Sequence, residues 1–264
     1  MAAIGSKAVS AIGSGLKSLT AGAISAGANF ENAMSSVAAI SGATGSDFDR
    51  LSEKAKQLGK STQYTASETA STMEYMAMAG WKTEDMLNGI EGVMDLAAAS
   101  GEDLAGVSDI VTDAMTAFGL SADGTTKIIK DGFTKEVSNA SHFADVLAAA
   151  SANSNTNVAM LGESFKYAAP VAGSLGYSVE DTAIALGLMA SSGLKSSMAG
   201  SSLRTILTNL AKPTDDISDA MDYLGISLQN GDGSMKSLMD IVTDLRGAFG
   251  QCKMPMDQFQ ENLD

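Results

Sequence analysis

Apolar residues in this chain recur every three or four positions, in short segments that open on a polar residue and close on glycine. This spacing puts the apolar side chains on one face of a helix, and the flanking residues are typical of helix starts and stops. The pattern predicts a mostly α-helical protein, an array of short glycine-capped helices. We expect helices over residues 31–40, 47–58, 66–79, 84–99, 102–118, 140–152, 159–175, 179–192, 196–211 and 214–224.

Particular residues mark the expected helix boundaries. At three starts an acidic residue follows Ser or Thr by three positions, so that the side chains can accept hydrogen bonds from free backbone N–H groups. These expected capping boxes are Ser46–Asp49, Thr65–Glu68 and Ser178–Asp181. Glycine in the left-handed conformation is expected to end several helices. The glycines at these positions are Gly59, Gly80, Gly101, Gly119, Gly176 and Gly193.

Part of the pattern occurs twice. Residues 74–77 match 166–169, and residues 96–101 match 188–193, each at a distance of 92 positions. Between them the segment that begins at Gly80 matches the one at Gly176, a distance of 96, so about one helical turn has been gained and then lost. The sequence therefore predicts an internally duplicated helical unit.

We expect six segments along the chain. They are an Ala/Gly-rich arm at 1–29, a helical unit at 30–123, a connecting insertion at 124–141, a second unit at 142–225, a hairpin plus helix at 226–251 and a tail at 252–264. The arm has apolar residues at helical spacing, but its glycines disfavour a stable helix, so it either orders against a partner or frays. Residues rich in Asn and Gly at 230–233 predict a β-hairpin over 226–236, the only strand pairing expected.

Composition narrows the classes of function. The 264 residues are 45% hydrophobic but only 5% aromatic, with 16 methionines, which suits helices packed through small side chains. A formal charge of −14 without a basic cluster argues against stable nucleic-acid binding. The one cysteine, Cys252, and the lack of an export signal favour a cytoplasmic origin, and the uncharged stretch 18–30 is too short to span a bilayer.

No set of residues predicts catalysis, a cofactor or a metal site. His142 is the only histidine, which excludes sites with several histidines and suggests a helix-start or surface residue. A carboxylate pair for glycoside hydrolysis is an alternative, but the acids concentrate at helix starts, where they complement the helix dipole. Glycines form no phosphate-binding motif. The methionines at 73, 76 and 78 are expected in the core.

Several strings occur in an order that resembles the core region of bacteriophage tail tape-measure proteins. They are Ser41-Gly42-Ala43-Thr44-Gly45, Ala79-Gly80-Trp81, Lys166-Tyr167-Ala168-Ala169-Pro170, Met198-Ala199-Gly200-Ser201-Ser202-Leu203-Arg204 and Ala211-Lys212-Pro213. The resemblance runs from about Phe30 to Gln251. It implies structural roles for Gly42, Gly45, Gly80, Trp81, Tyr167, Pro170, Gly176, Gly200, Lys212 and Pro213.

The resemblance implies a structural virion protein, not an enzyme, that lies in the tail tube lumen and at the tail tip after assembly in the host cytoplasm. It implies a scaffold for tail tube polymerisation that leaves the tube to let DNA pass. Its partners would be the tail tube protein, tail tip or baseplate hub proteins and tail assembly chaperones. The family further implies an axial homo-oligomer of three or six copies, and membrane contact during infection.

Two features depart from the family pattern. The connection at 124–141 is longer than expected, and the chain stops soon after the core, which favours a truncated or split product, or a core that docks while other segments measure. Even a continuous helix of this length would reach only about 400 Å. Two other functions stay open, a membrane-active helical protein that aids genome passage and a cell-wall-degrading enzyme.

Overall fold

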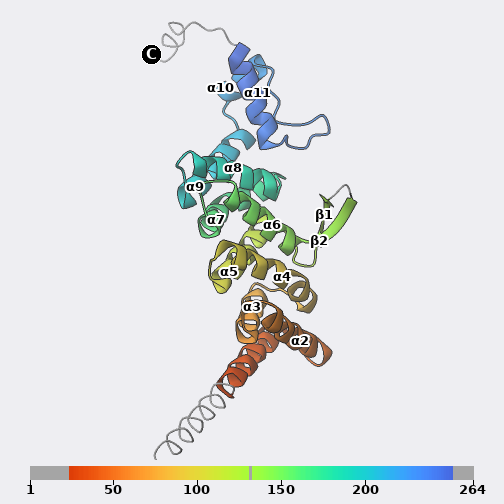
Figure 1. Ribbon diagram of the computed structural model, residues 1–264. Coiled ribbons are helices and arrows are strands. Elements are labelled where there is room, and N and C mark those ends of the chain that lie inside the picture. Colours follow the sequence, from red (N-terminus) through yellow and green to blue (C-terminus); the bar gives the residue numbers. More distant parts are fainter. Residues whose placement is uncertain (1–23, 131–132, 252–264) are drawn as a thin grey trace, which may run out of the picture. The chain divides into compact units, whose positions relative to one another are not determined.

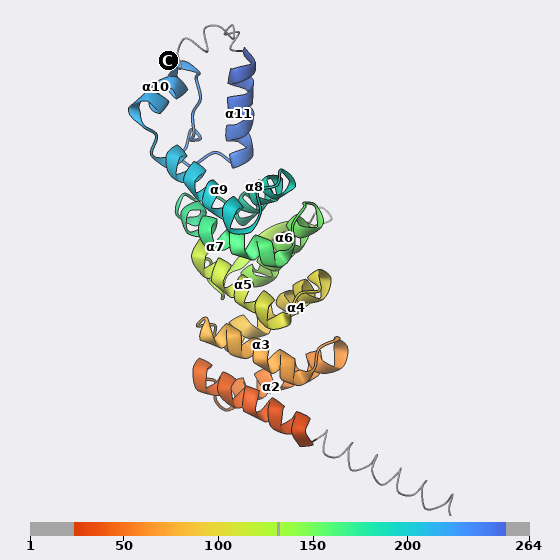
Figure 2. The same cartoon turned by 90° about the vertical axis from the view of Figure 1, so that its left-hand side faces the viewer.

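The computed structural model describes residues 24–130 and 133–251, which are mostly helical. A first helix covers residues 24–41. The named helices are α2 (Ser46–Ser61), α3 (Ala66–Met78), α4 (Thr83–Ser100), α5 (Leu104–Phe118), α6 (Asn139–Ala152), α7 (Val158–Ser174), α8 (Val179–Ser191), α9 (Ser196–Ala211), α10 (Asp215–Tyr223) and α11 (Leu238–Gln251). They agree with the expected ranges to within a few residues, so the α-helical class is confirmed. Figure 1 and Figure 2 show short helices joined by tight turns.

The chain divides into two compact units. Unit 1 contains residues up to 112 together with 122–141, and unit 2 contains residues 113–121 together with those from 142 onward. In unit 1, α2 packs against α3 and α4. In unit 2, α7 packs against α8 and α9, and α8 also contacts α11. The sequence places segment boundaries at residues 30, 142 and 226, and these boundaries stay a prediction. The expected tail at 252–264 lies outside the described residues, and so do residues 1–23 of the expected arm at 1–29.

Each unit has an apolar core of a different composition. In unit 1 the fully buried side chains are mainly aliphatic and thioether groups, including Met73 and Met76 as expected. The expectation was wrong for Met78, which is 57% exposed. In unit 2 three aromatic rings meet, with centroids 5.5 Å apart for Phe143 and Phe165, and 5.7 Å apart for Phe118 and Phe165. Rings at such separations gain about 0.5–1.5 kcal/mol beyond the burial of their area. The few aromatic residues of this chain are thus partly concentrated in one cluster.

Small residues allow the helices of unit 2 to cross at close range. A methyl group placed on Gly200 of α9 would overlap the carbonyl oxygen of Ser164 on α7. The Ser164 hydroxyl lies 2.8 Å from the carbonyl oxygen of Ser196 and 2.9 Å from that of Met160, so it can donate to either helix. A buried polar side chain with an acceptor on both sides is satisfied where two backbones meet.

Helix termini follow the expected chemistry at most positions. Thr65 and Glu68 form the reciprocal capping box, and the Ser178 hydroxyl accepts a hydrogen bond from the backbone N–H of Asp181. At α2 the expectation was wrong, because the N-cap is Gly45 and no side chain caps the helix. Gly45 has a positive φ of 55°, which lets the backbone turn into the helix without a capping hydroxyl.

One of the six glycines expected to end a helix lies inside a helix instead. Five of the six have positive φ, as expected for left-handed caps. Gly59 instead lies inside α2, where a methyl group would overlap the backbone of Ala66 at the start of α3. Its role is therefore the close approach of two helices, and the helix ends two residues later at Ser61.

The paired strands lie at a different place from the expected one. Strands β1 (Thr125–Lys130) and β2 (Phe133–Ser138) form an antiparallel ribbon that projects to the right in Figure 1. The segment 226–236 holds only an isolated bridge between Gln229 and Met235. The expectation that it would be the only strand pairing was wrong.

Side-chain chemistry explains the difference. β1 and β2 are rich in Thr, Ile and Val, which favour strands, and Asp-Gly stands between them in the sequence, a strong hairpin signal. Residues 226–236 have few such side chains. There Asp232 accepts hydrogen bonds from both the backbone N–H and the hydroxyl of Ser234, so local bonds compete with a strand ladder.

Replacement of Gly200 by alanine tests the close helix crossing. We expect Gly200→Ala to lower the free energy of unfolding by about 1–3 kcal/mol, because the added methyl group must separate α9 from α7. Urea unfolding followed by circular dichroism measures the change. Gly231→Ala is the matched control, since among the described residues no atom lies within 4 Å of its methyl position. A Gly200→Ala protein as stable as the parent would show that the helices are not in tight contact.

Candidate functional site

The described residues hold no cluster of three or more side chains that could bind a metal ion. Acidic residues instead lie in the first turns of α2, α3, α4 and α8, as their spacing in the sequence indicated. Arg50 and the sole histidine each pair with one of these acids. Cys252 lies outside the described residues.

The positions singled out by the family resemblance are spread along the chain. Gly42, Gly45, Gly80 and Gly176 have positive φ next to helix ends, and Trp81 is buried against Gly89. Tyr167 and Pro170 are exposed on α7, while Gly200 lies at the crossing of α9 with α7. Lys212 and Pro213 follow the end of α9. Most of these residues shape turns or helix contacts and do not converge on one site.

The two units repeat the same succession of helices. Positions in α2 and α3 correspond to those in α6 and α7 at a distance of 92 residues, and the starts of α4 and α8 at a distance of 96. The distance between corresponding residues rises from 92 to 96 because α7 has 17 residues whereas α3 has 13. It falls again because α8 has 13 residues whereas α4 has 18. One turn is gained in the second helix and about one turn is lost in the third.

Exposure at corresponding positions supports this alignment. Trp81 is 4% exposed and its counterpart Tyr177 is 5% exposed. Tyr75 is 38% exposed and its counterpart Tyr167 is 39% exposed. Buried and exposed aromatic residues thus recur at the same places, as expected if the two units share one architecture.

A side-chain contact between the first and third helices of this succession is also repeated. In unit 1 the guanidinium of Arg50 on α2 makes two hydrogen bonds to the Glu84 carboxylate on α4, at 2.5 and 3.1 Å. In unit 2 the corresponding residues are His142 on α6 and Glu180 on α8, whose Nε2 and Oε1 atoms lie 2.7 Å apart. The hydrogen bond from Arg50 lowers the pKa of Glu84. His142 lies in the first turn of α6 with its side chain 14% exposed, so the expectation of a helix-start or surface residue is met by its place at the start of the helix.

A second ion pair of unit 1 has no counterpart in unit 2. Lys54 on α2 bonds to Glu91 on α4 at 2.5 Å. The corresponding positions in unit 2 are Val146 on α6 and Gly187 on α8, neither of which carries a charge. Where unit 1 has a polar bridge between its helices, unit 2 has an open apolar surface.

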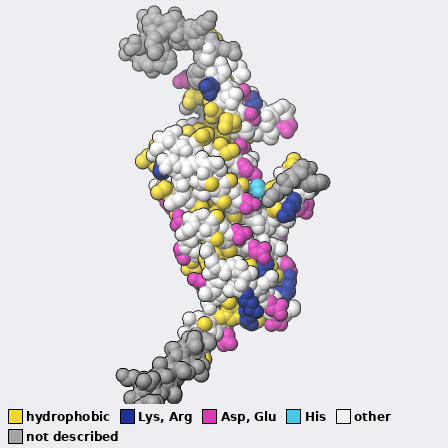
Figure 3. Space-filling model, viewed as in Figure 1, with side chains coloured by type: hydrophobic (Ala, Val, Ile, Leu, Met, Phe, Trp, Pro, Cys, Tyr) yellow, Lys and Arg dark blue, Asp and Glu magenta, His cyan; other side chains and the backbone are white. Residues whose placement is uncertain are grey.

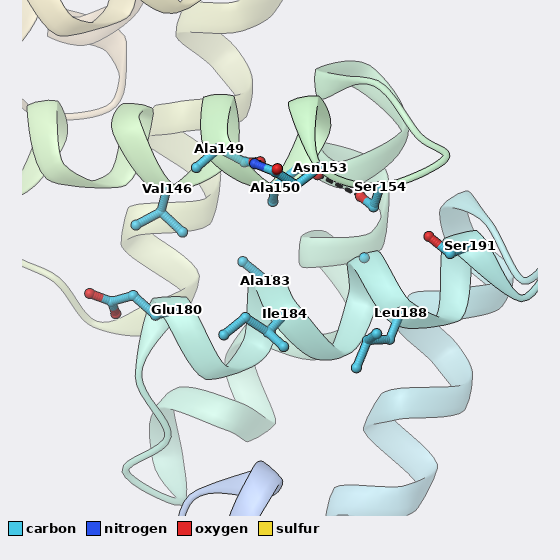
Figure 4. A pocket seen from close by; sticks show the side chains of 11 residues that line it. Val146, Ala149, Ala150, Asn153, Ser154, Glu180, Ala183, Ile184, Leu188 and Ser191 are labelled. Carbon is cyan, nitrogen blue, oxygen red and sulfur yellow. Dashed lines mark hydrogen bonds between the residues drawn. The ribbon is translucent and has the colours of Figure 1, made fainter.

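This surface is a groove of about 400 Å³ between α6 and α8. Figure 4 shows Val146 and Ala150 of α6 facing Ala183 of α8, with Glu180 near one end and Ser191 near the other. Ser191 accepts a hydrogen bond from the backbone N–H of Asn155, which ties that end to the turn after α6. The lining residues are Val146, Ala149, Ala150, Asn153, Ser154, Glu180, Ala183, Ile184, Gly187, Leu188 and Ser191.

Charge near the groove is negative. Glu180 lies at its rim, and burial is the main cause that raises the pKa of the neighbouring Asp181. Burial, and then the Asp181 charge, also raise the pKa of Tyr177. On the face shown in Figure 3, acidic side chains are distributed more widely than Lys and Arg. Sequence reasoning missed the groove, because the pairing of Lys54 with Glu91 joins two separate helices and only the structure reveals it.

None of the helices in the described ranges has the length and apolar character needed to cross a membrane. This observation concerns residues 24–130 and 133–251 alone.

The comparisons with known proteins point to the tails of bacteriophages. The chain is 38% identical over 233 residues to the "Tape measure protein" of Pneumococcus phage Dp-1, a match of 88% of this chain and 19% of that protein. It is 24% identical over 213 residues to the "Probable tape measure protein" of Escherichia phage P2, with 81% of this chain and 24% of that protein covered. The chain thus spans only a fifth to a quarter of these relatives, and no solved structure matches.

A family model described as "Phage-related minor tail protein" matches residues 52–261. The resemblance drawn from the sequence is confirmed by this match and by the two relatives. Because the model covers most of its length, this chain belongs to the phage-related minor tail protein family.

Proposed function

We propose that this chain is the folded core of a tape-measure protein that acts as a structural scaffold in tail assembly. The observation that carries the proposal is the 38% identity to a tape measure protein over 88% of the chain. In this role the core docks at the tail tip, and tail tube subunits polymerise around the tape-measure protein that contains this core. It leaves the tube at infection so that DNA can pass.

The proposal assigns docking, and not measuring, to this region. A ruler must be extended, and a continuous helix gains only about 1.5 Å per residue. Here the chain reverses direction after helices of 9 to 18 residues. The residues therefore form packed helices and add little to the extended length of the protein. The same region makes up only 19% of the relative from phage Dp-1, whose remaining length is available for the ruler.

The proposed partners are the tail tube protein, tail tip or hub proteins and assembly chaperones, with three or six copies along the tail axis. Exposed apolar side chains on the outer faces of the helices of unit 2 support contacts of this kind, since such side chains gain free energy when a partner covers them. They include Met160, Tyr167, Met198 and Ile206.

Deletion of this region in a phage tests the docking role. We expect that in-frame removal of the codons for residues 24–251 abolishes tails, because the tube then lacks the site at which polymerisation starts. Electron microscopy of lysates measures tail number and tail length. A plasmid copy of the intact gene should restore tails in the same lysate.

Two outcomes would contradict the docking role. Tails that are only shorter, by up to about 1.5 Å for each residue removed, would show that the region measures length. Tails of normal number and length would show that it has no part in assembly.

The acidic surface leads to a separate prediction about DNA. With a formal charge of −14, the chain should repel the phosphate backbone, so it does not stick to DNA that replaces it in a narrow tube. We expect no micromolar binding of the purified chain to double-stranded DNA at low salt, measured by fluorescence anisotropy. A basic DNA-binding protein serves as the positive control. Micromolar affinity at low salt would refute this part of the proposal.

A further inference from the structure

We propose that α10 packs against α11 of a second copy of this chain, through an apolar stripe on each helix. Both helices belong to unit 2, and both stripes are exposed within one copy. The inference rests on the proposed function in one respect, because it names the surface through which the several proposed copies contact one another.

The stripe of α10 is open to solvent. Ile217, Ala220, Met221 and, at the C-cap, Leu224 follow the spacing i, i+3, i+4 and i+7, which puts them on one face of the helix. Ile217 is 46% exposed, and the helix has no buried residue. Short helices gain most of their stability by packing an apolar face, so this helix of nine residues is expected to pack against a partner.

The other side of α10 is strongly acidic. Asp215, Asp216, Asp219 and Asp222 occupy four of its nine positions, and the helix has no basic residue. A complementary partner therefore offers apolar side chains together with positive charge. The groove between α6 and α8 does not meet this condition, because Glu180 lies at its rim and none of its lining residues is basic.

The exposed face of α11 has both properties. Leu238 and Ile241 are buried, whereas Met239 and Val242 are 50% and 56% exposed. Arg246 lies one turn beyond Val242 on the same face and is also exposed. α11 therefore combines open apolar side chains with a positive charge, as the acidic α10 requires.

The acidic residues of α11 do not oppose this pairing. By helical spacing Asp240 and Asp244 lie on a different side of the helix from Met239 and Val242. Both carboxylates also have partners of their own. The ammonium group of Lys236 lies 2.7 Å from Asp244, and the hydroxyl of Ser237 donates a hydrogen bond of 2.8 Å to Asp240.

A second copy can supply what one copy leaves open. Ile217 of α10 and Met239 of α11 are exposed in the same copy, so the two stripes do not cover each other. In a closed symmetric assembly each copy gives its α10 to one neighbour and receives an α10 on its α11, which covers every stripe. One such contact is smaller than the roughly 1,200 Å² of a stable interface, so we expect a weak association.

Charge reversal in the purified full chain tests the inference. One variant carries Asp219→Lys and Asp222→Lys on α10, and the other carries Arg246→Glu on α11. All three side chains are exposed, so the circular dichroism spectrum should stay unchanged. By sedimentation equilibrium we expect the parent chain to self-associate with a dissociation constant on the order of 100 μM. Each variant alone should associate at least about tenfold more weakly, because the attraction between α10 and α11 is lost or reversed.

An equimolar mixture of the two variants separates contacts between copies from contacts within one copy. In the mixture, the α10 with added lysines can meet the α11 with the Arg246→Glu change. Association should therefore return to within about threefold of the parent. Recovery requires contact between copies, since every single chain keeps one mismatched pair of helices.

A double reversal in unit 1, Glu53→Lys with Asp109→Lys, is the matched control. It changes the net charge by the same amount as the α10 variant, also at exposed positions. We expect it to associate like the parent. An equal loss of association in this control would show a general effect of charge and overturn the inference.

Three further results would overturn it. A parent chain that stays monomeric at about 0.5 mM shows that the two stripes do not bind each other. Variants that associate as the parent does show that another surface is used. Loss in both variants without recovery in the mixture shows that α10 and α11 do not meet across copies. None of these results bears on the scaffold role, which the deletion in the phage tests separately through tail number and length.

Discussion

The helices of this protein are held together by close approach of their backbones at a few glycine positions. The chain has few aromatic residues, and at several glycines its helices meet backbone to backbone. Gly200 against Ser164 and Gly59 against Ala66 are the tightest of these contacts. Packing at such points gains dispersion energy that larger residues would forfeit by separating the helices. Position and size of side chains matter more here than their chemistry.

The architecture could be predicted from the sequence to a large extent, because periodicity and capping act locally. Thr65 with Glu68 predicted the start of α3, and glycines such as Gly101 predicted helix ends. Local rules failed where two residues distant in sequence decide the outcome. Gly59 looked like a helix end, but the approach of α3 gives it another role. The strands at 125–138 were missed because the Asp-Gly signal stood in a segment read only as a connection.

The candidate groove shows what a single sequence can and cannot supply. The duplication was visible in matching strings around Tyr75 and Tyr167, and the structure places these two tyrosines at nearly the same exposure. The pairing of Lys54 with Glu91 across 37 positions was not visible, because no local rule links residues on separate helices. Only with that pair known does the uncharged character of Val146 and Gly187 become informative. Comparison of the two units thus shows which side chains differ between equivalent positions of one chain.

The β1–β2 ribbon has only two strands. Two strands leave both outer edges with backbone groups that no further strand in the described chain satisfies, and a ribbon of this size is marginal in water. Lys127 and Glu136 face each other across it at 3.7 Å, a pair exposed enough to add little. Its amide hydrogens should therefore be among the first to exchange with solvent, well before those of the buried helices, which makes the ribbon the natural place for the fold to open locally.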